Sequence, residues 1–160
     1  MLQSEETSIG YRIAENEVIP LSKPLKSADV QKAIQNKQTI AEHGEIATLA
    51  IPVRIRDEVI GAIDIRTNYE HTWDDDEVDI AEAVAERLSL ALEAALLLKT
   101  TQRRAEIERI TADISGKIGA TTQFDSILRT AAEELSRVLG GSEVLVQIQP
   151  LESFGDNGNS

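Results

Sequence analysis

The sequence has no cysteine, and this absence excludes several kinds of chemistry. Without thiols the chain forms no disulfide, no thiolate nucleophile, no thiolate metal site and no thioether-linked cofactor. The absence is consistent with a reducing compartment. The first ten residues contain neither the basic region nor the apolar segment of a signal peptide. We therefore expect a soluble, cytoplasmic protein.

Aromatic residues and positive charge are also scarce. Aromatic residues make up 3% of the chain, so nucleobases have few rings on which to stack. The net charge of −12 opposes binding to a phosphate backbone or to an anionic lipid surface. The longest nearly apolar run, residues 88–98, contains Ser89 and Glu93 and is too short to span a bilayer. We therefore expect neither a nucleic-acid partner nor a membrane partner.

No combination of residues indicates catalysis or metal binding. We find no Ser-His-Asp set and no pair of carboxylates that could be singled out as acid and base. The two histidines, His43 and His71, have no ligand at metal-site spacing and are expected to be solvated loop residues. We therefore expect no enzyme activity, no catalytic residue, no metal and no cofactor, and the sequence identifies no ligand-binding residue.

Apolar residues, which are mostly aliphatic, make up 41% of the chain and allow a real core. Residues 1–73 are expected to form a sheet with one short helix opening at Ser27 or Asp29. Over residues 47–67 branched aliphatic residues alternate with polar ones on either side of a turn at residues 57–58. This period of two predicts a β-hairpin.

The positions of two residues in this hairpin indicate how its strands are placed. Pro52 cannot donate a hydrogen bond to a neighbouring strand, so its strand is expected at a sheet edge, or Pro52 at a bulge. Asp64 is the polar exception on an otherwise apolar strand. If its side chain points inward, it must be hydrogen-bonded.

A long helix is predicted over residues 74–114. Asp74 and Glu77 have the spacing of a capping box at its start. At 1.5 Å per residue the helix would be roughly 60 Å long, which is more than the width of a small domain. Apolar residues recur along it at steps of three and four, and we interpret this stripe as a dimerisation surface: Val84, Leu88, Ala91, Leu92, Ala95 and Leu98.

The rest of the chain is expected in three parts. Residues 115–122, "SGKIGATT", are predicted to be a break. Residues 123–149 are predicted to be a helix followed by a strand, separated by a glycine pair. The polar residues 150–160 are predicted to be a disordered tail.

The hairpin "IPVRIRDEVIGAIDI" followed by "WDDDEVDIAEAVAERLSLALEAALL" resembles the C-terminal half of a GAF domain. The resemblance covers residues 10–98, and its most specific parts are the Ile60-Gly61 step and the helix opening at residues 73–77. It implies an α+β fold with a GAF-like antiparallel sheet, flanking helices and a long dimerisation and signalling helix.

Residues 123–149 resemble the helix and strand that open a GAF domain. Two interpretations follow. The chain can be the end of one such unit joined to the beginning of the next. Alternatively, the last helix and strand complete the first sheet, either within the chain or, as we favour, by exchange between two chains, because an apolar terminal strand needs a partner.

The function expected from these observations is non-catalytic sensing and signal transmission. A helix that outruns its sheet carries an apolar stripe that a second copy can cover, which predicts a homodimer. The resemblance implies that such a helix passes a signal to a kinase or another signalling output protein. The alternative is a small-molecule-binding domain whose ligand lies between the sheet and residues 28–46.

Overall fold

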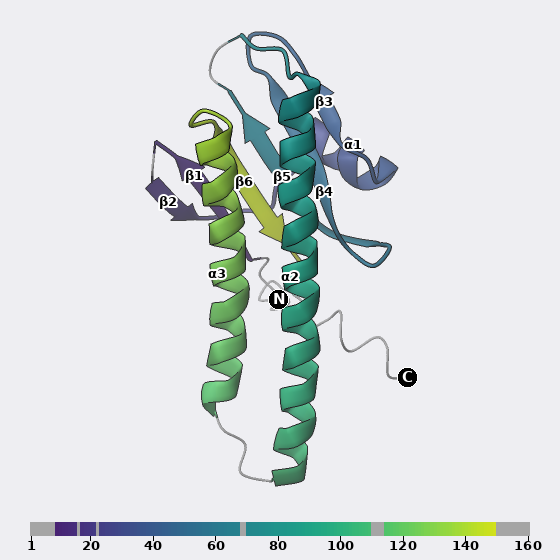
Figure 1. Ribbon diagram of the computed structural model, residues 1–160, viewed down its shortest axis with the longest axis vertical. Helices are drawn as coiled ribbons and strands as arrows, with labels where there is room; N and C mark the ends of the chain where they lie inside the picture. Colours follow the sequence, from purple (N-terminus) through teal and green to yellow (C-terminus); the bar gives the residue numbers. More distant parts are fainter. Residues whose placement is uncertain (1–8, 16, 22, 68–69, 110–113, 150–160) are drawn as a thin grey trace.

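The computed structural model describes residues 9–149 apart from 16, 22, 68–69 and 110–113 (Figure 1). The fold is α+β, with an antiparallel sheet flanked by helices, as predicted. The elements in chain order are β1 (Ile9–Ala14), β2 (Glu17–Pro20), α1 (Ala28–Asn36), β3 (Ile40–Glu42), β4 (Thr48–Ile55), β5 (Glu58–Arg66), α2 (Asp75–Arg109), α3 (Ile114–Val138) and β6 (Glu143–Ile148). The predicted tail at 150–160 lies outside the described residues.

The six strands form one sheet in the order β2-β1-β6-β5-β4-β3. The last strand of the chain, β6, lies between β1 and β5 and pairs antiparallel with both. It therefore joins the N-terminal β1–β2 hairpin to the β3–β5 half of the sheet. In this structure the chain's own C-terminal helix and strand complete its N-terminal sheet.

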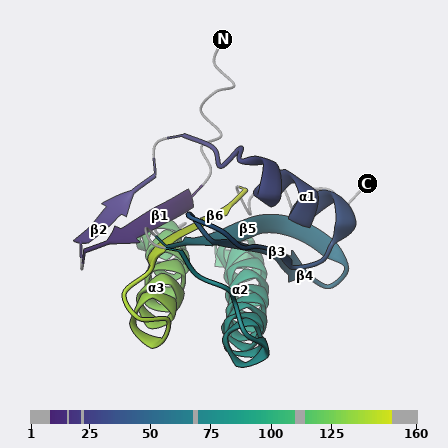
Figure 2. The ribbon, with the colours of Figure 1, turned by 90° about the horizontal axis from the view of Figure 1, so that it is seen from above.

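The helices lie on both faces of the sheet (Figure 2). Helices α2 and α3 run side by side on one face and extend together past the end of the sheet, whereas α1 covers the other face (Figures 1 and 2). The main core fills the space between the sheet and the α2–α3 pair. Its fully buried side chains include Leu49, Ile55, Ile60, Ile63, Ile65, Leu92, Leu128, Leu135, Val144 and Ile148.

A second, smaller core lies under α1. Val30 and Ala33 of α1 pack with Ala50 of β4 and Ala62 of β5, and all four side chains are buried. Small side chains on the sheet let the helix backbone lie close to it. Because few methyl groups are buried here, α1 gains less stabilisation from burial than α2 or α3.

Gly61 is required by the pairing of β5 with β6. A Cβ atom at this position would lie 2.1 Å from the backbone oxygen of Gln147 and 2.7 Å from the Cα of Ile148. No side chain fits at such distances, so the glycine allows β6 to approach. The β4–β5 register shifts between Val53 and Arg54, next to this position, which is the irregularity expected of a bulge.

The position of Pro52 agrees with its missing N–H group. Strand β3 pairs with β4 only over residues 48–50, so Pro52 lies beyond the end of β3. On that side β4 is the edge of the sheet, which is where a proline is tolerated.

The helical region differs from the prediction after α2. Helix α2 spans Asp75–Arg109, and residues 110–113 of the predicted helix lie outside the described residues. The predicted break at residues 115–122 is wrong, because these residues are helical and α3 already begins at Ile114. The glycines at positions 116 and 119 led to this error. A glycine inside a helix costs only about 1 kcal/mol relative to alanine, so it weakens a helix without ending it.

Candidate functional site

Two carboxyl groups are buried together beneath α1. Asp64 of β5 has no exposed surface, and Asp29 in the first turn of α1 is 8% exposed. Side chains alternate along a strand, and the neighbouring Ile63 and Ile65 point into the main core. Asp64 therefore points to the opposite face, toward α1.

The hydrogen-bond donors around Asp64 all reach the same oxygen. Its Oδ2 accepts from Nη2 and Nε of Arg66, at 2.9 and 3.0 Å, and from the hydroxyl of Ser27 at 3.4 Å. Among the described residues no donor reaches Oδ1 of Asp64 or Oδ2 of Asp29. The expectation that an inward-pointing Asp64 is hydrogen-bonded is therefore confirmed for only one of its two oxygens.

The two carboxyl groups have opposite protonation tendencies. Burial raises the pKa of Asp64 to about 7, the negative charge of Asp29 acts in the same direction, and Arg66 opposes both. For Asp29, burial also acts to raise the pKa, but hydrogen bonds with Ser27, Thr48 and Asp64 outweigh it and the pKa is lowered. A hydrogen bond between the two carboxyls requires that one of them carries a proton, and these shifts place that proton on Asp64.

Gln147 fixes the segment that leads into α1. Its side-chain oxygen accepts from the N–H of Leu25 at 2.8 Å, and its side-chain nitrogen donates to the carbonyl of Lys23 at 3.1 Å. Beside it is a cavity of about 230 Å³ between α1 and the strands β5 and β6. The cavity is lined by Leu25, Val30, Ile34, Val59, Ile60, Gly61, Ala62, Gln147, Ile148 and Gln149. This lining is largely apolar.

The predicted dimerisation stripe lies mainly inside the molecule. Val84, Leu88, Leu92 and Ala95 are at most 3% exposed and belong to the main core. Ala91 is half-buried and lines a cavity of about 260 Å³ against α3, and only Leu98 is clearly exposed. The expectation that this stripe lacks an intramolecular partner is therefore wrong: the sheet and α3 cover most of it.

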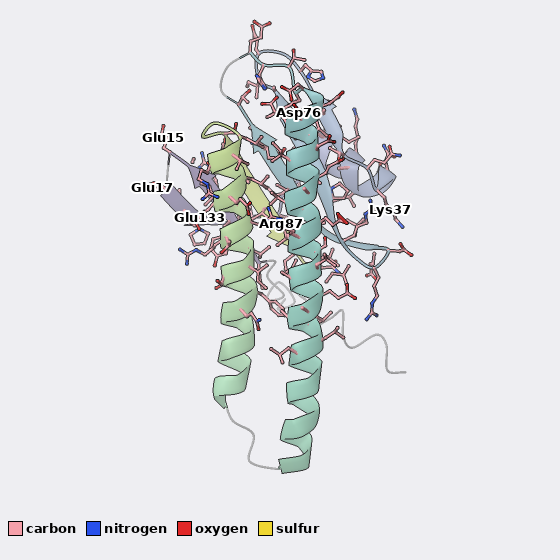
Figure 3. All side chains as sticks on the ribbon, in the orientation of Figure 1. Glu15, Glu17, Lys37, Asp76, Arg87 and Glu133 are labelled. Atoms are coloured by element: carbon pink, nitrogen blue, oxygen red, sulfur yellow. The ribbon has the colours of Figure 1, made fainter. Side chains whose placement is uncertain are left out.

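Helix α2 has a second apolar stripe, which faces outward and which we call the outer stripe. Its members are Ile80, Ala83, Leu90, Ala94 and Leu97. All five are exposed, with 42% for Ile80, 62% for Leu90 and 53% for Leu97. One position in the series, Arg87 (Figure 3), is charged. Arg87 donates to Glu134 of α3 at 2.6 Å.

The start of α2 is closed by reciprocal hydrogen bonds, and the residue before it is bonded to the sheet. Glu77 N–H donates to Asp74 Oδ1 at 2.8 Å, and Asp74 N–H donates to Glu77 Oε1 at 3.1 Å. These are the two bonds of a capping box. Next to it, the buried Trp73 donates from its indole nitrogen to the carbonyl of Thr48 on β4 at 3.0 Å.

The two histidines contribute to the same junction. His43 accepts from the N–H of Trp73 at 3.2 Å, and His71 Nε2 lies 3.0 Å from Glu77. The His71 ring meets the Trp73 ring edge-on at 4.9 Å between centroids. Both histidines lie in loops, as expected, and His43 is exposed, whereas His71 is half-buried. The expectation omitted that both side chains contact the residues at the start of the helix.

A further cavity, of about 790 Å³, is an open groove between the edge of β4 and α2. Its basic residues are Lys37 (Figure 3), Arg54 and Arg56, and its acidic residues are Glu82, Glu86 and Glu93. Because both signs of charge line it, the groove favours neither anions nor cations. Among the residues that the structure describes, no group of three or more histidines and acidic residues could hold a metal ion.

Comparison with models of known protein families identifies the family of this chain. The family model of the GAF domain matches residues 1–92, more than half of the sequence. The chain belongs to the GAF domain family. Membership in this family indicates a signalling or sensor module. No solved structure matches the chain.

The GAF match ends inside α2, so α3 and β6 lie beyond it. These two elements nevertheless supply part of the main core and a central strand of the sheet. Within the described residues of this GAF domain, no helix is both long enough and apolar enough to cross a membrane.

Sequence reasoning singled out Asp64 but missed Asp29 and the outer stripe. Asp29 was noted only as a helix start, because an acidic residue in a first turn is common. The outer stripe had a usable signal: positions 80, 83, 87, 90, 94 and 97 follow the alternating steps of three and four of a heptad pattern, and only position 87 is charged. The other stripe, which no charge interrupts, obscured it.

Proposed function

We propose that this GAF domain is a non-catalytic sensor and signalling module that forms a homodimer through the outer stripe of α2. The dimer passes its signal to a kinase or another signalling output protein in the cytoplasm. The observation that carries the proposal is the exposure of Leu90, which is a large aliphatic residue 62% open to solvent in the middle of the outer stripe. Large apolar surfaces of this kind mark interaction sites when they form a contiguous patch.

The spacing of the outer stripe supports a second copy of α2 as its partner. With Ile80 at position a of a heptad, Ala83, Leu90 and Leu97 fall at d and Ala94 falls at a. A repeat of 3.5 residues keeps such a seam facing an identical helix. A self-complementary stripe of this period is the surface that a two-fold symmetric dimer requires.

The charges beside the outer stripe support a parallel pair. On one flank lie Glu86 and Glu93, and on the other lie Ala91 and Leu98. In a parallel pair each acidic flank meets the apolar flank of the second copy, so the carboxylates do not oppose one another. Arg87, at position a, would then lie beside Glu86 of the second copy, an attractive contact.

The junction of α2 with the sheet supports signal transmission. The indole–carbonyl bond from Trp73 to Thr48 connects the residue before the capping box to β4, and the capping box holds the first turn of α2 together. A conformational change in the sheet would therefore move α2 as a rigid element and would not unwind its first turn. Two such helices in a parallel dimer can transmit a rotation or shift.

The test is native mass spectrometry together with sedimentation equilibrium of the full chain and of Leu90→Glu. We expect the unmodified chain to be a dimer at micromolar concentration and Leu90→Glu to be a folded monomer, because the two introduced carboxylates, one from each copy, would be buried opposite each other in the seam. Ser89→Glu is the matched control. It adds the same charge one residue away, outside the outer stripe, and should remain dimeric.

Two results would refute the dimer proposal: a monomeric unmodified chain, or a Leu90→Glu protein that still dimerises. Circular dichroism of each variant establishes that its fold is retained. Leu88→Glu is unsuitable for this purpose, since Leu88 is 2% exposed in the main core and the variant would unfold.

The second candidate function is small-molecule binding between the sheet and residues 28–46. It is favoured by the cavity of about 230 Å³ under α1 and its largely apolar lining. Pockets of this kind bind ligands by burying apolar surface, with a few polar groups for orientation. Gln147 and Gln149 are the polar residues at this cavity. The same native mass spectra test this candidate, because a retained ligand adds a defined mass to the chain.

A further inference from the structure

We propose that Asp29 and Asp64 hold a single proton between them, and that this shared proton is a pH-dependent latch that keeps α1 closed over the sheet. The latch goes beyond the signalling function and does not depend on dimerisation. Release of the proton would open α1 and expose the face of the sheet beneath it, including the apolar cavity there.

Counting buried charges gives the first argument. Asp64 is fully buried, Asp29 is 8% exposed, and among the described residues Arg66 is the one cation bonded to the pair. Two ionised carboxylates beside one guanidinium would leave a net negative charge on buried groups. That arrangement is costly, and a buried carboxyl in such a position takes up a proton instead.

The hydrogen-bond pattern gives the second argument. Each carboxyl has one oxygen, Oδ1 of Asp64 and Oδ2 of Asp29, that no donor reaches among the described residues. A buried acceptor without a donor is rare and needs an explanation. One O–H···O bond between the two side chains satisfies both groups at once, and the two carboxyls are close enough to form it.

Within the part of the chain that the structure describes, the elements packed around Asp64 bring no further charged group that could replace the proton. From α1 the facing charge is Asp29, and along β5 it is Arg66. From β4 and β6 the residues directly opposite Asp64 are Ala50 and Leu145, which are both apolar. The next charged residue on β6, Glu143, is paired with Arg12.

The latch joins two elements that otherwise hold each other weakly. Asp29 belongs to α1 and Asp64 to the sheet, and among the described residues the buried apolar contacts of α1 are those of the small core around Val30 and Ala33. When the proton leaves, two like charges face each other across this contact. Since repulsion and desolvation both favour separation, α1 opens and water reaches both carboxylates.

The test uses the absence of cysteine in the chain. A single cysteine is introduced at the fully buried Ala33 (Ala33→Cys), and, in a separate protein, at the exposed Gln35 on the same helix (Gln35→Cys). Labelling by 4,4′-dithiodipyridine is followed from pH 5 to pH 8.5. Dividing the rate at position 33 by the rate at position 35 removes the pH dependence of thiol reactivity and leaves the opening of α1.

We expect this ratio to rise about tenfold per pH unit between pH 5 and 6.5, because one proton is released on opening, and to level off above about pH 7. With Asp64→Asn added, the ratio should not change with pH. With Asp29→Asn added, the rise should end at a lower pH, because the repulsion that keeps Asp64 protonated is gone. A flat ratio in the first protein, or an unchanged rise in Asp64→Asn, would overturn the latch.

A second measurement keeps the proposal testable if Asp64→Asn does not fold. Carbon NMR of the unmodified protein, labelled at the aspartate carboxyl carbons, resolves each titration. We expect one aspartate to titrate near neutral pH and to shift in step with the amides of α1. If every aspartate titrates below pH 5, the shared proton does not exist.

Discussion

At the scale of single residues, Asp64 governs how the stability of the whole chain responds to pH. Folding raises its pKa from 3.8 to about 7, so the folded state binds the proton more tightly than the unfolded state. The resulting stabilisation is complete below pH 3.8 and is lost as the pH rises toward 7. Asp29, whose pKa is lowered, acts oppositely and only at more acidic pH.

We therefore predict that the free energy of unfolding falls between about pH 4 and pH 7 through Asp64, with a slope of about 1.4 kcal/mol per pH unit. Above pH 7 the contribution of Asp64 should be absent. Urea denaturation at half-unit steps of pH measures the slope, and Asp64→Asn should lack it. The exposed Asp76→Asn provides the control and should follow the unmodified chain. Parallel curves for Asp64→Asn and the unmodified chain would contradict the prediction.

The residue scale also shows the limit of sequence reasoning. Asp64 could be recognised because a lone acid interrupts a run of isoleucines. Its partner could not, since Asp29 is 35 positions earlier on a different element. Only the packing of α1 on the sheet brings the two carboxyls together. A buried pair across elements leaves no periodic signal in a sequence, whereas helices and hairpins do.

At the scale of elements, the capping box makes α2 begin at a defined residue. Replacing Asp74 by alanine removes the acceptor of the Glu77 N–H bond, and the loss of such a cap costs about 1 kcal/mol. We predict that Asp74→Ala lowers the free energy of unfolding by about that amount. Chemical denaturation measures it.

Asp76→Ala is the matched comparison for this cap, because Asp76 is exposed in the same turn (Figure 3) and is also acidic. It should lose only the interaction of its charge with the helix dipole, about 0.5 kcal/mol. If both variants lose the same stability, charge rather than the hydrogen bond accounts for the effect of Asp74.

The start and approximate length of α2 and the β4–β5 hairpin could be predicted, because each depends on a local sequence pattern. The face of α2 that meets the sheet could not be predicted from such a pattern. Both stripes are apolar, and α3 covers a face that would otherwise be open. Helix α3 follows α2 in the chain, but where it lies depends on β6 pairing with strands more than 75 residues away.

At the scale of the whole molecule, the position of β6 determines whether the GAF-matched residues can fold alone. The match ends at residue 92, yet β6 separates β1 from β5 and provides the pairing for both. In sequence, the C-terminal helix and strand resemble the opening of a GAF domain. The sequence did not determine which sheet they complete, because no local pattern specifies which distant strands pair.

We predict that a chain ending at Leu98 does not fold, although it contains the whole GAF match. It would leave β5 and β1 as open edges and uncover the core that Phe124, Leu128, Leu135 and β6 fill. Both the lost burial and the unpaired backbone groups are unfavourable.

A chain ending at Gln149 keeps every described element and should fold like the full chain. Circular dichroism and proton–nitrogen NMR spectra distinguish the outcomes, and supplying residues 99–160 as a separate chain should restore the spectrum. Cooperative unfolding of the Leu98 chain alone would show that the first five strands are self-sufficient and that β6 is an addition to a complete sheet.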